Sequence, residues 1–339
     1  MSIPYRTRNR IKRFALVLLV LCIVAVVVGA CWLIWLGRFV VYTRNDGAKL
    51  DFSMSNSQLK GEIVRKPIIE NPISIYYNEG DQAISTGRQL EQMKGYYITR
   101  EDLESNFEQV KAQVRILESG TPVMVDMKSI YGNFFYSSSV SDKRNEDLDI
   151  EAMDAFIKSL NSAGFYTIAR VPALRDFHYG LENVQYGLPV AAGYLWMDDA
   201  GCYWLNPAND GTVSYLAQIA NELKNLGFDE VVFCDFYVPT HQSIVFKGDR
   251  AQALHNAAQT LVNTCSTEGF AVSFTVTSSF DAPTGRSRFY LEDAIAADAQ
   301  KLANQYEFED PAVRVVFLTD IHDTRFDSFS VLRPIADAE

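Results

Sequence analysis

The sequence predicts an α/β protein built as a (β/α)8 barrel of the TIM type, complete or degraded at its edges. From residue 95 onward, short apolar runs of strand length alternate with amphipathic helical patterns, and this alternation is typical of parallel sheets. No glycine-rich phosphate loop follows any predicted strand, which disfavours a nucleotide-binding open sheet. A doubly wound open sheet is the alternative architecture.

The barrel elements are predicted from apolar spacing and from turn residues. The strands are residues 95–99, 122–128, 165–171, 230–235, 271–277 and 312–319, and residues 73–77 and 329–335 are candidates for two more. The helices are residues 101–117, 150–163, 213–226, 250–268 and 289–306. A long insertion, residues 172–210, separates the third strand from its helix.

The amino terminus predicts a membrane anchor. Residues 1–13 form a basic tail without acids, and residues 14–36 are uncharged and mostly apolar. A helix of that length spans about 35 Å, which is enough for a bilayer core of about 30 Å. Because basic flanks stay in the cytoplasm, we expect a single-pass protein of the cell membrane with an extracellular domain. Residues 37–94 are predicted to be a stalk, and residues 95–339 the barrel.

Cleavage of this segment is the alternative. Val28, Gly29 and Ala30 resemble a signal-peptidase site, and with Cys31 they resemble a lipoprotein signal. The apolar run continues through residues 32–36, whereas a mature secreted amino terminus is usually polar. An uncleaved anchor is therefore favoured.

Charge and cysteine content restrict the partners. The chain has 31 basic and 42 acidic residues, and seven of the basic ones precede residue 45, so the remainder has a net charge of about −18. Such a surface excludes nucleic acid as a partner and fits a solvated extracellular domain. Only Cys202, Cys234 and Cys265 lie beyond the anchor, which gives neither a disulfide framework nor a CxxC zinc motif.

Residues 225–239 contain the strongest indication of a site. The helix before them ends at Gly227, and the buried strand that follows ends at Asp235. Since side chains alternate along a strand, Phe233 and Asp235 are expected on one face and Cys234 on the other, towards the helices. Ligands bind at the carboxyl ends of parallel strands, so Asp235 is the first candidate.

The order of motifs resembles a bacterial family of glycoside hydrolase-like (β/α)8 barrels, formerly known as a domain of unknown function. The matching motifs lie within residues 93–280, and they are Lys94-Gly95-Tyr96-Tyr97-Ile98-Thr99, Asp126-Met127-Lys128, Ala169-Arg170 with Arg175-Asp176, Trp204-Leu205-Asn206-Pro207, and Gly227-Phe228-Asp229-Glu230 with Asp235 and Pro239. The resemblance implies a barrel with activity on polysaccharide. The family's Arg before Pro239 is missing here.

Strand alternation predicts a catalytic constellation. If their faces point inward, Asp126, Arg170 and Asp235 meet at one rim of the barrel. Glycoside hydrolysis needs two carboxyl groups. We therefore predict Asp235 with Asp126 or Asp176 as catalytic groups, and Arg170 and Lys128 as substrate-binding groups. Alternatively, Asp126 and Arg170 form a salt bridge that only holds the rim.

The insertion at residues 172–210 is rich in aromatic residues. Aromatic rings can stack on the apolar faces of sugars, so Tyr194, Trp196 and Trp204, together with Tyr237 beyond the insertion, are predicted to bind substrate. The alternative is that these rings only pack the loop.

We thus expect a membrane-anchored glycosidase of the bacterial cell envelope that acts on polysaccharide without a cofactor or metal. The alternative is a carbohydrate-binding or envelope module that has lost part of its acid–base set. A metal-dependent deacetylase is disfavoured because the four histidines lack zinc-ligand spacing.

Overall fold

The computed structural model describes residues 40–43, 47–50, 90–277 and 279–338. Its contacts divide the chain into two units, Met1–Glu79 and Gly80–Glu339. In the first unit, β1 (Val40–Thr43) and β2 (Gly47–Leu50) pair as an antiparallel hairpin, which the sequence analysis did not predict in the stalk segment. The predicted anchor, residues 14–36, and the candidate strand, residues 73–77, lie outside the described residues. Across the described ranges, no helix has the length and apolar character needed to cross a membrane.

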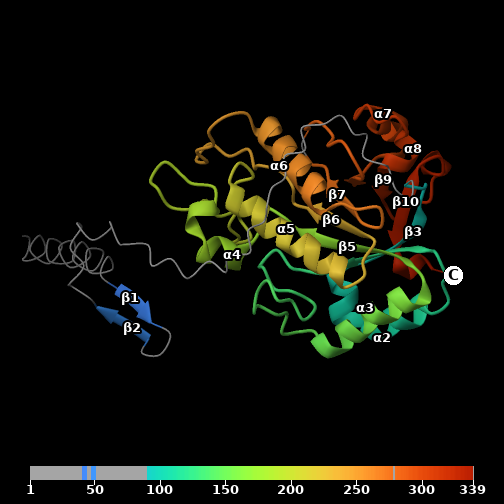
Figure 1. The fold of residues 1–339 in the computed structure, drawn as a ribbon, viewed down its shortest axis with the longest axis horizontal. Coiled ribbons are helices and arrows are strands. Elements are labelled where there is room, and N and C mark those ends of the chain that lie inside the picture. The colour runs from blue at the N-terminus through green and yellow to red at the C-terminus, as the bar shows by residue number, and fades with distance from the viewer. Residues whose placement is uncertain (1–39, 44–46, 51–89, 278, 339) are drawn as a thin grey trace, which may run out of the picture. The chain divides into compact units, whose positions relative to one another are not determined.

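The second unit is a closed barrel of eight parallel strands, which confirms the predicted architecture (Figure 1). The strands follow one another around the barrel in sequence order, and β10 closes it against β3. They are β3 (Lys94–Ile98), β4 (Pro122–Asp126), β5 (Tyr166–Pro172), β6 (Glu230–Cys234), β7 (Ala271–Thr275), β8 (Phe289–Glu292), β9 (Val315–Leu318) and β10 (Ser330–Pro334).

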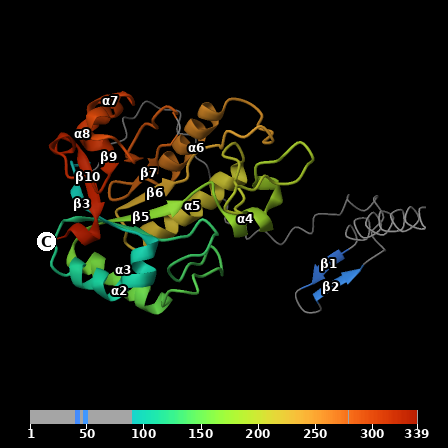
Figure 2. The ribbon, with the colours of Figure 1, turned by 180° about the vertical axis from the view of Figure 1, so that it is seen from behind.

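The helices are long in the first half of the barrel and short in the last part (Figures 1 and 2). The long ones are α2 (Arg100–Val114), α3 (Ile150–Ala163), α5 (Asp210–Asn225) and α6 (Arg250–Cys265). The short ones are α4 (Phe177–Glu182), α7 (Ala299–Asn304) and α8 (Pro311–Arg314), with 3-10 turns η2 (Val184–Tyr186), η3 (Ala296–Asp298), η4 (Thr324–Phe326) and η5 (Ile335–Asp337). No helix lies between β7 and β8 among the described residues there. Helices are thus short or missing in part of the barrel, whereas the sheet is complete.

The last part of the barrel confirms one predicted element and corrects another. The candidate strand at residues 329–335 is confirmed as β10. The predicted helix at residues 289–306 is wrong at its start, because residues 289–292 form β8 and the helix α7 begins only at Ala299. Aromatic residues favour strands, and Phe289 and Tyr290 are fully buried in the sheet. The alanine-rich residues that follow have a helical pattern, and the predicted helix therefore began too early in the sequence.

Side chains of the strands fill two separate layers. One cluster lies inside the barrel and includes Met124, Ile168, Val232, Tyr290 and Val316. The larger cluster lies between the sheet and the helices, where the alternate residues of the same strands pack against α2, α3, α5 and α6. This alternation determines which polar side chains reach the barrel mouth.

Candidate functional site

Three charged side chains lie at the carboxyl end of the barrel interior. Asp126 and Glu292 are the last residues of β4 and β8, and Arg170 lies near the end of β5. Each follows by two positions a residue of the interior apolar cluster, so all three face into the barrel mouth. The predicted convergence of Asp126 with Arg170 is therefore found in the structure.

Arg170 lies between the two carboxyl groups. Its Nε is 3.6 Å from Asp126 Oδ1, and its Nη2 is 3.4 Å from Glu292 Oε1. Both distances exceed those of good hydrogen bonds. Within the described chain the buried Nε has no hydrogen-bond partner, while Asp126 Oδ2 accepts the backbone N–H of Arg100 at 2.9 Å. The ion pairs are loose, so a ligand can compete for these groups.

The carboxyl groups at the mouth are harder to ionise than usual. Burial is the largest cause and raises the pKa of Asp126, Asp235 and Glu292, while the charge of Arg170 lowers each pKa in part. The charges of Asp235 and Asp126 raise the pKa of Glu292 further. A carboxyl group with a raised pKa is suited to donate a proton near neutral pH.

The inward face of β6 is the opposite of the predicted one. Val231 and Phe233 belong to the outer cluster, whereas Val232 lies inside the barrel and Cys234 contacts Arg170. The prediction that Cys234 points towards the helices is wrong. Burial raises the pKa of the Cys234 thiol to about 12, which keeps it neutral.

Asp235 follows β6 in a left-handed conformation. Its φ of 49° costs a non-glycine residue about 1–2 kcal/mol and breaks the strand alternation. The half-buried carboxyl group makes no hydrogen bond or ion pair within the described residues, yet it senses the charges of Arg175, Arg170 and Lys128. Asp235 thus interacts with the charged groups of the mouth, although β6 does not present the predicted face to the barrel interior.

Asp176 and Lys128 follow the carboxyl ends of β5 and β4 and form a buried ion pair. Asp176 Oδ2 is 2.7 Å from Lys128 Nζ, and both side chains are 0% exposed. Asp176 also accepts hydrogen bonds from Tyr215 Oη at 2.8 Å and from the backbone N–H of Tyr179, while Lys128 donates to the carbonyl of Pro172. These groups are saturated and covered. This burial argues against a catalytic role for Asp176 and a substrate-binding role for Lys128, which remain predictions.

The predicted aromatic residues separate into buried and accessible rings. Trp204 is 2% exposed, donates from Nε1 to Asp198 at 2.9 Å, and packs edge-on against Tyr237 at 4.7 Å. A ring so covered is not accessible to a sugar in this structure, which argues against the binding role predicted for Trp204. Tyr194 is 66% exposed, and Trp196 and Tyr237 are half-buried, so these three remain accessible.

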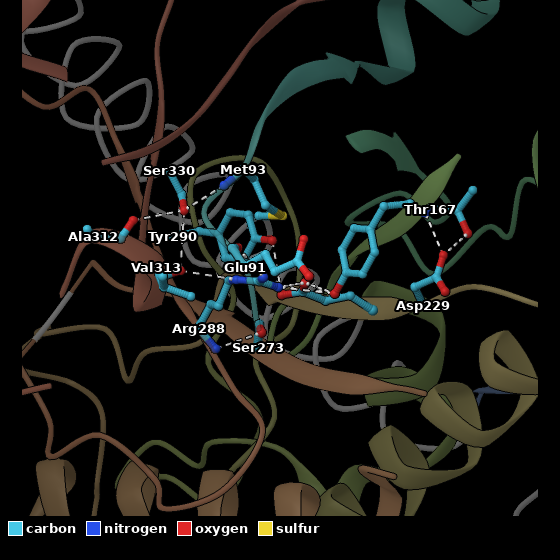
Figure 3. Close-up of polar contacts among 12 residues, drawn as sticks. Glu91, Met93, Thr167, Asp229, Ser273, Arg288, Tyr290, Ala312, Val313 and Ser330 are labelled. Atoms are coloured by element: carbon cyan, nitrogen blue, oxygen red, sulfur yellow. Dashed lines mark hydrogen bonds and ion pairs between the residues drawn. The ribbon is translucent and has the colours of Figure 1, made fainter. Parts of the chain in front are cut away.

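A second cluster of polar side chains closes the amino-terminal end of the barrel interior (Figure 3). Arg288 Nη1 lies 2.5 Å from Glu230 Oε2, and Tyr166 and Tyr290 donate hydroxyl hydrogen bonds to Glu230 at 2.9 and 3.0 Å. Arg288 also donates to the carbonyls of Glu91 and Val313. Arg288 is 1% exposed and Glu230 is 0% exposed, so this cluster is structural.

Glu292 is the residue of the mouth that sequence reasoning missed. It lay within the predicted helix, and 38% of its side chain is exposed. The run Phe289-Tyr290-Leu291-Glu292 is a short apolar segment that ends at an acid, as residues 230–235 do. This likeness to residues 230–235 could have indicated Glu292 as a residue of the site.

The mouth can perform acid–base chemistry on a neutral polar ligand. Nitrogens of one guanidinium lie only about 2.3 Å apart, so the Asp126 and Glu292 oxygens paired with Arg170 are separated by at most about 9.3 Å, an upper limit that does not exceed the largest separation of paired glycosidase carboxyls. In the described part of the chain, no three His, Cys, Asp or Glu side chains are grouped as metal ligands.

Comparison with known proteins gives one family and several similar folds. A hypothetical protein from Ruminiclostridium thermocellum is 19% identical, with a TM-score of 0.45 over 52% of this chain and 96% of that one. An α-galactosidase from Lactobacillus brevis is 10% identical, with a TM-score of 0.48 over 72% and 37%. One from Geobacillus stearothermophilus is 11% identical, with a TM-score of 0.48 over 75% and 41%.

This chain spans about two fifths of the length of those two α-galactosidases. No curated protein sequence matches it. The family model described as "Putative glycosyl hydrolase domain" matches residues 95–269, which include Asp126, Arg170 and Asp235. This match covers more than half of the chain and confirms the resemblance drawn from the motifs. The chain therefore belongs to this glycosyl hydrolase-like family.

Proposed function

We propose that this protein hydrolyses glycosidic bonds of a polysaccharide with a pair of carboxyl groups at the barrel mouth. The observation that supports this most directly is that the carboxyl groups of Asp126 and Glu292 lie 3.6 and 3.4 Å from Arg170, with Asp235 close enough to help raise the pKa of Glu292. Glycoside hydrolysis requires two carboxyl groups, one protonated and one ionised, and we assign Glu292 and Asp235 to these roles.

The two groups take different roles in this proposal. Glu292 is the general acid, because burial and two neighbouring carboxylates favour its protonated form. Asp235 is assigned as the nucleophile or base: burial raises its pKa, but Arg175, Arg170 and Lys128 lower it in part, and no hydrogen bond restrains the carboxyl group in the described chain. Asp126 is a positioning residue that holds Arg170 and is itself held by the N–H of Arg100.

The experiment compares the full chain in detergent with Glu292→Gln and Asp235→Asn on a panel of envelope and plant polysaccharides. Release of reducing ends should fall by about 10²–10⁴-fold in either variant. An aryl glycoside with a good leaving group needs no acid, so Glu292→Gln should recover most of its activity there, whereas Asp235→Asn should not. Wild-type rates in both variants would contradict the proposal.

A binding module is the second candidate, favoured by the ion pairs of Arg170 with Asp126 and Glu292. Paired carboxylates can accept hydrogen bonds from sugar hydroxyls without any proton transfer. For this candidate we expect glycan binding without hydrolysis, even at high substrate concentration and after long incubation, and weaker binding in Glu292→Gln.

We also propose that residues 14–36 anchor the protein in the cell membrane with the barrel outside. The support is the basic tail followed by an uncharged apolar run. Protease added to intact cells should degrade the barrel, and the mature chain should retain Met1. A mature chain that begins at Ala30, Cys31 or Trp32 would show that the segment is cleaved.

A further inference from the structure

A cavity of about 480 Å³ lies beside the loop that follows Asp235. It is lined by this loop, by the start of α6 and by the loop after β7, through Thr240, Phe246, Asp249, Arg250 and Ser279 among others. Its volume is in the range of sites that hold small ligands. None of these residues belongs to the cluster around Arg170.

The cavity is at the same end of the barrel as the mouth. Helices of a (β/α) barrel begin at the carboxyl ends of the strands, so Arg250, the first residue of α6, is at the mouth end. Val238 and Thr240 line the cavity and follow Asp235 by three and five residues. A chain of that length spans at most about 11 Å and 18 Å, a distance that a short oligosaccharide covers.

The wall of the cavity is chemically suited to a sugar. Arg250 Nε is buried and has no hydrogen-bond partner among the described residues, and the guanidinium lies over the ring of Phe246, 5.9 Å from its centroid. A buried donor without a partner is unfavourable, and a small shift of the half-buried Arg250 side chain would let a ligand hydroxyl group satisfy it. The half-buried Phe246 ring and the exposed hydroxyl groups of Thr240 and Ser279 complete a surface of one ring and several donors.

The loop that forms this wall is fixed to the aromatic insertion. Val245 donates its backbone N–H to the carbonyl of Pro189 at 2.8 Å, and Val190 pairs with Ile244. Trp196 of the insertion packs against His241 of the same loop at 5.6 Å. The accessible rings and the cavity are therefore parts of one connected surface beside Asp235.

We propose that this cavity is a subsite for a pyranose residue of the glycan, a few residues away from the bond that is cleaved. The proposal rests on the proposed function for its choice of ligand. Arg250 donates to sugar hydroxyl groups, and Phe246 packs on an apolar face of the sugar. The substrate is then an extended glycan chain, and the subsite gives longer chains tighter binding than disaccharides.

The test measures binding of the full chain in detergent to di- and hexasaccharides of glucose, galactose, mannose, xylose and N-acetylglucosamine. We expect the hexasaccharide of at least one sugar to bind at least tenfold more tightly than its disaccharide. Arg250→Lys keeps the charge but removes Nε and the planar group, and should reduce this ratio about tenfold. Phe246→Ala should reduce it about 2–10-fold. Lys247→Ala, an exposed neighbour that does not line the cavity, should leave it unchanged.

Melting curves of each variant show whether the chain still folds, and Arg250→Gln serves as a second variant if Phe246→Ala unfolds. A wild-type ratio in Arg250→Lys and Arg250→Gln would overturn the subsite. So would binding that is independent of chain length, or no binding to any saccharide in the series. Length-dependent binding that the variants lose, without hydrolysis of any glycan, would support the subsite and contradict only the proposed hydrolysis.

Discussion

The two ends of the barrel interior each hold an arginine beside acidic side chains, but their contacts differ. At the amino-terminal end, Arg288 and Glu230 are buried and bonded on all sides, at distances of 2.5–3.2 Å. At the mouth, Arg170 lies 3.4 and 3.6 Å from its carboxylates, which are partly exposed. A closed network leaves no group for a ligand, whereas an open one does.

Strand β7 shows the same difference between Ser273 and Thr275, which are two positions apart. Ser273 Oγ accepts the backbone N–H of Arg288 at 2.8 Å in the closed half of the interior. Thr275, two positions closer to the mouth on β7, has a buried hydroxyl group with no partner in the described chain. Similar polar residues therefore stabilise the fold at one end and lack a partner near the other.

The largest contrast is expected between two glutamates. Glu230→Gln leaves Arg288 buried without a countercharge and should destabilise the fold by about 3–5 kcal/mol. Glu292→Gln removes one loose and partly exposed pair, and should cost less than about 1 kcal/mol. Urea unfolding of both variants measures the difference. Equal losses would mean that the mouth is as closed as the opposite end.

Two tryptophans extend the contrast to the insertion. Trp204→Ala should destabilise the protein by about 3–5 kcal/mol, because the ring is buried and bonded to Asp198. Trp196→Ala should cost less stability and weaken binding of the best hexasaccharide by about 2–10-fold. Melting and titration of the two variants test this, and a stable Trp204→Ala would contradict the packing role.

A smaller difference is expected on β7. Ser273→Ala removes an acceptor from the N–H of Arg288 and should cost about 1 kcal/mol. Thr275→Val has a similar shape and removes a buried hydroxyl group without a partner, so it should not destabilise the protein and should stabilise it by up to about 1–3 kcal/mol. Denaturant midpoints of the two variants are compared. A larger loss in Thr275→Val would show that its hydroxyl group already has a structural partner.

The smallest expected effect concerns the pH dependence of hydrolysis. Arg170 lowers the pKa of Asp126, Asp235 and Glu292, so Arg170→Met should raise all three pKa values. Hydrolysis needs one carboxyl group protonated and one ionised, so both limbs of the kcat/KM profile should move to higher pH. Arg170→Lys keeps the charge and is the control. A profile that moves to lower pH contradicts this electrostatic role.

Much of the barrel could be predicted because its signals are local. Apolar runs of strand length, the helices capped by Asp149 and Asp249, and the stop at Gly227 with its φ of 95° depend on residues close in sequence. Strand alternation likewise brought Asp126 and Arg170 together. The motif order was enough to indicate the family that the comparison then confirmed.

The roles within the mouth depended on tertiary structure. Alternation could not predict the left-handed conformation at Asp235, which follows a strand whose Cys234 faces inward. It could not reveal that Asp176 is saturated by Lys128 and Tyr215, or that Trp204 is covered, because burial depends on segments distant in sequence. Sequence alone thus determined the barrel and the end at which acids gather. Packing decided which acids remain free, since a charge can react only where neighbouring side chains leave it unsatisfied.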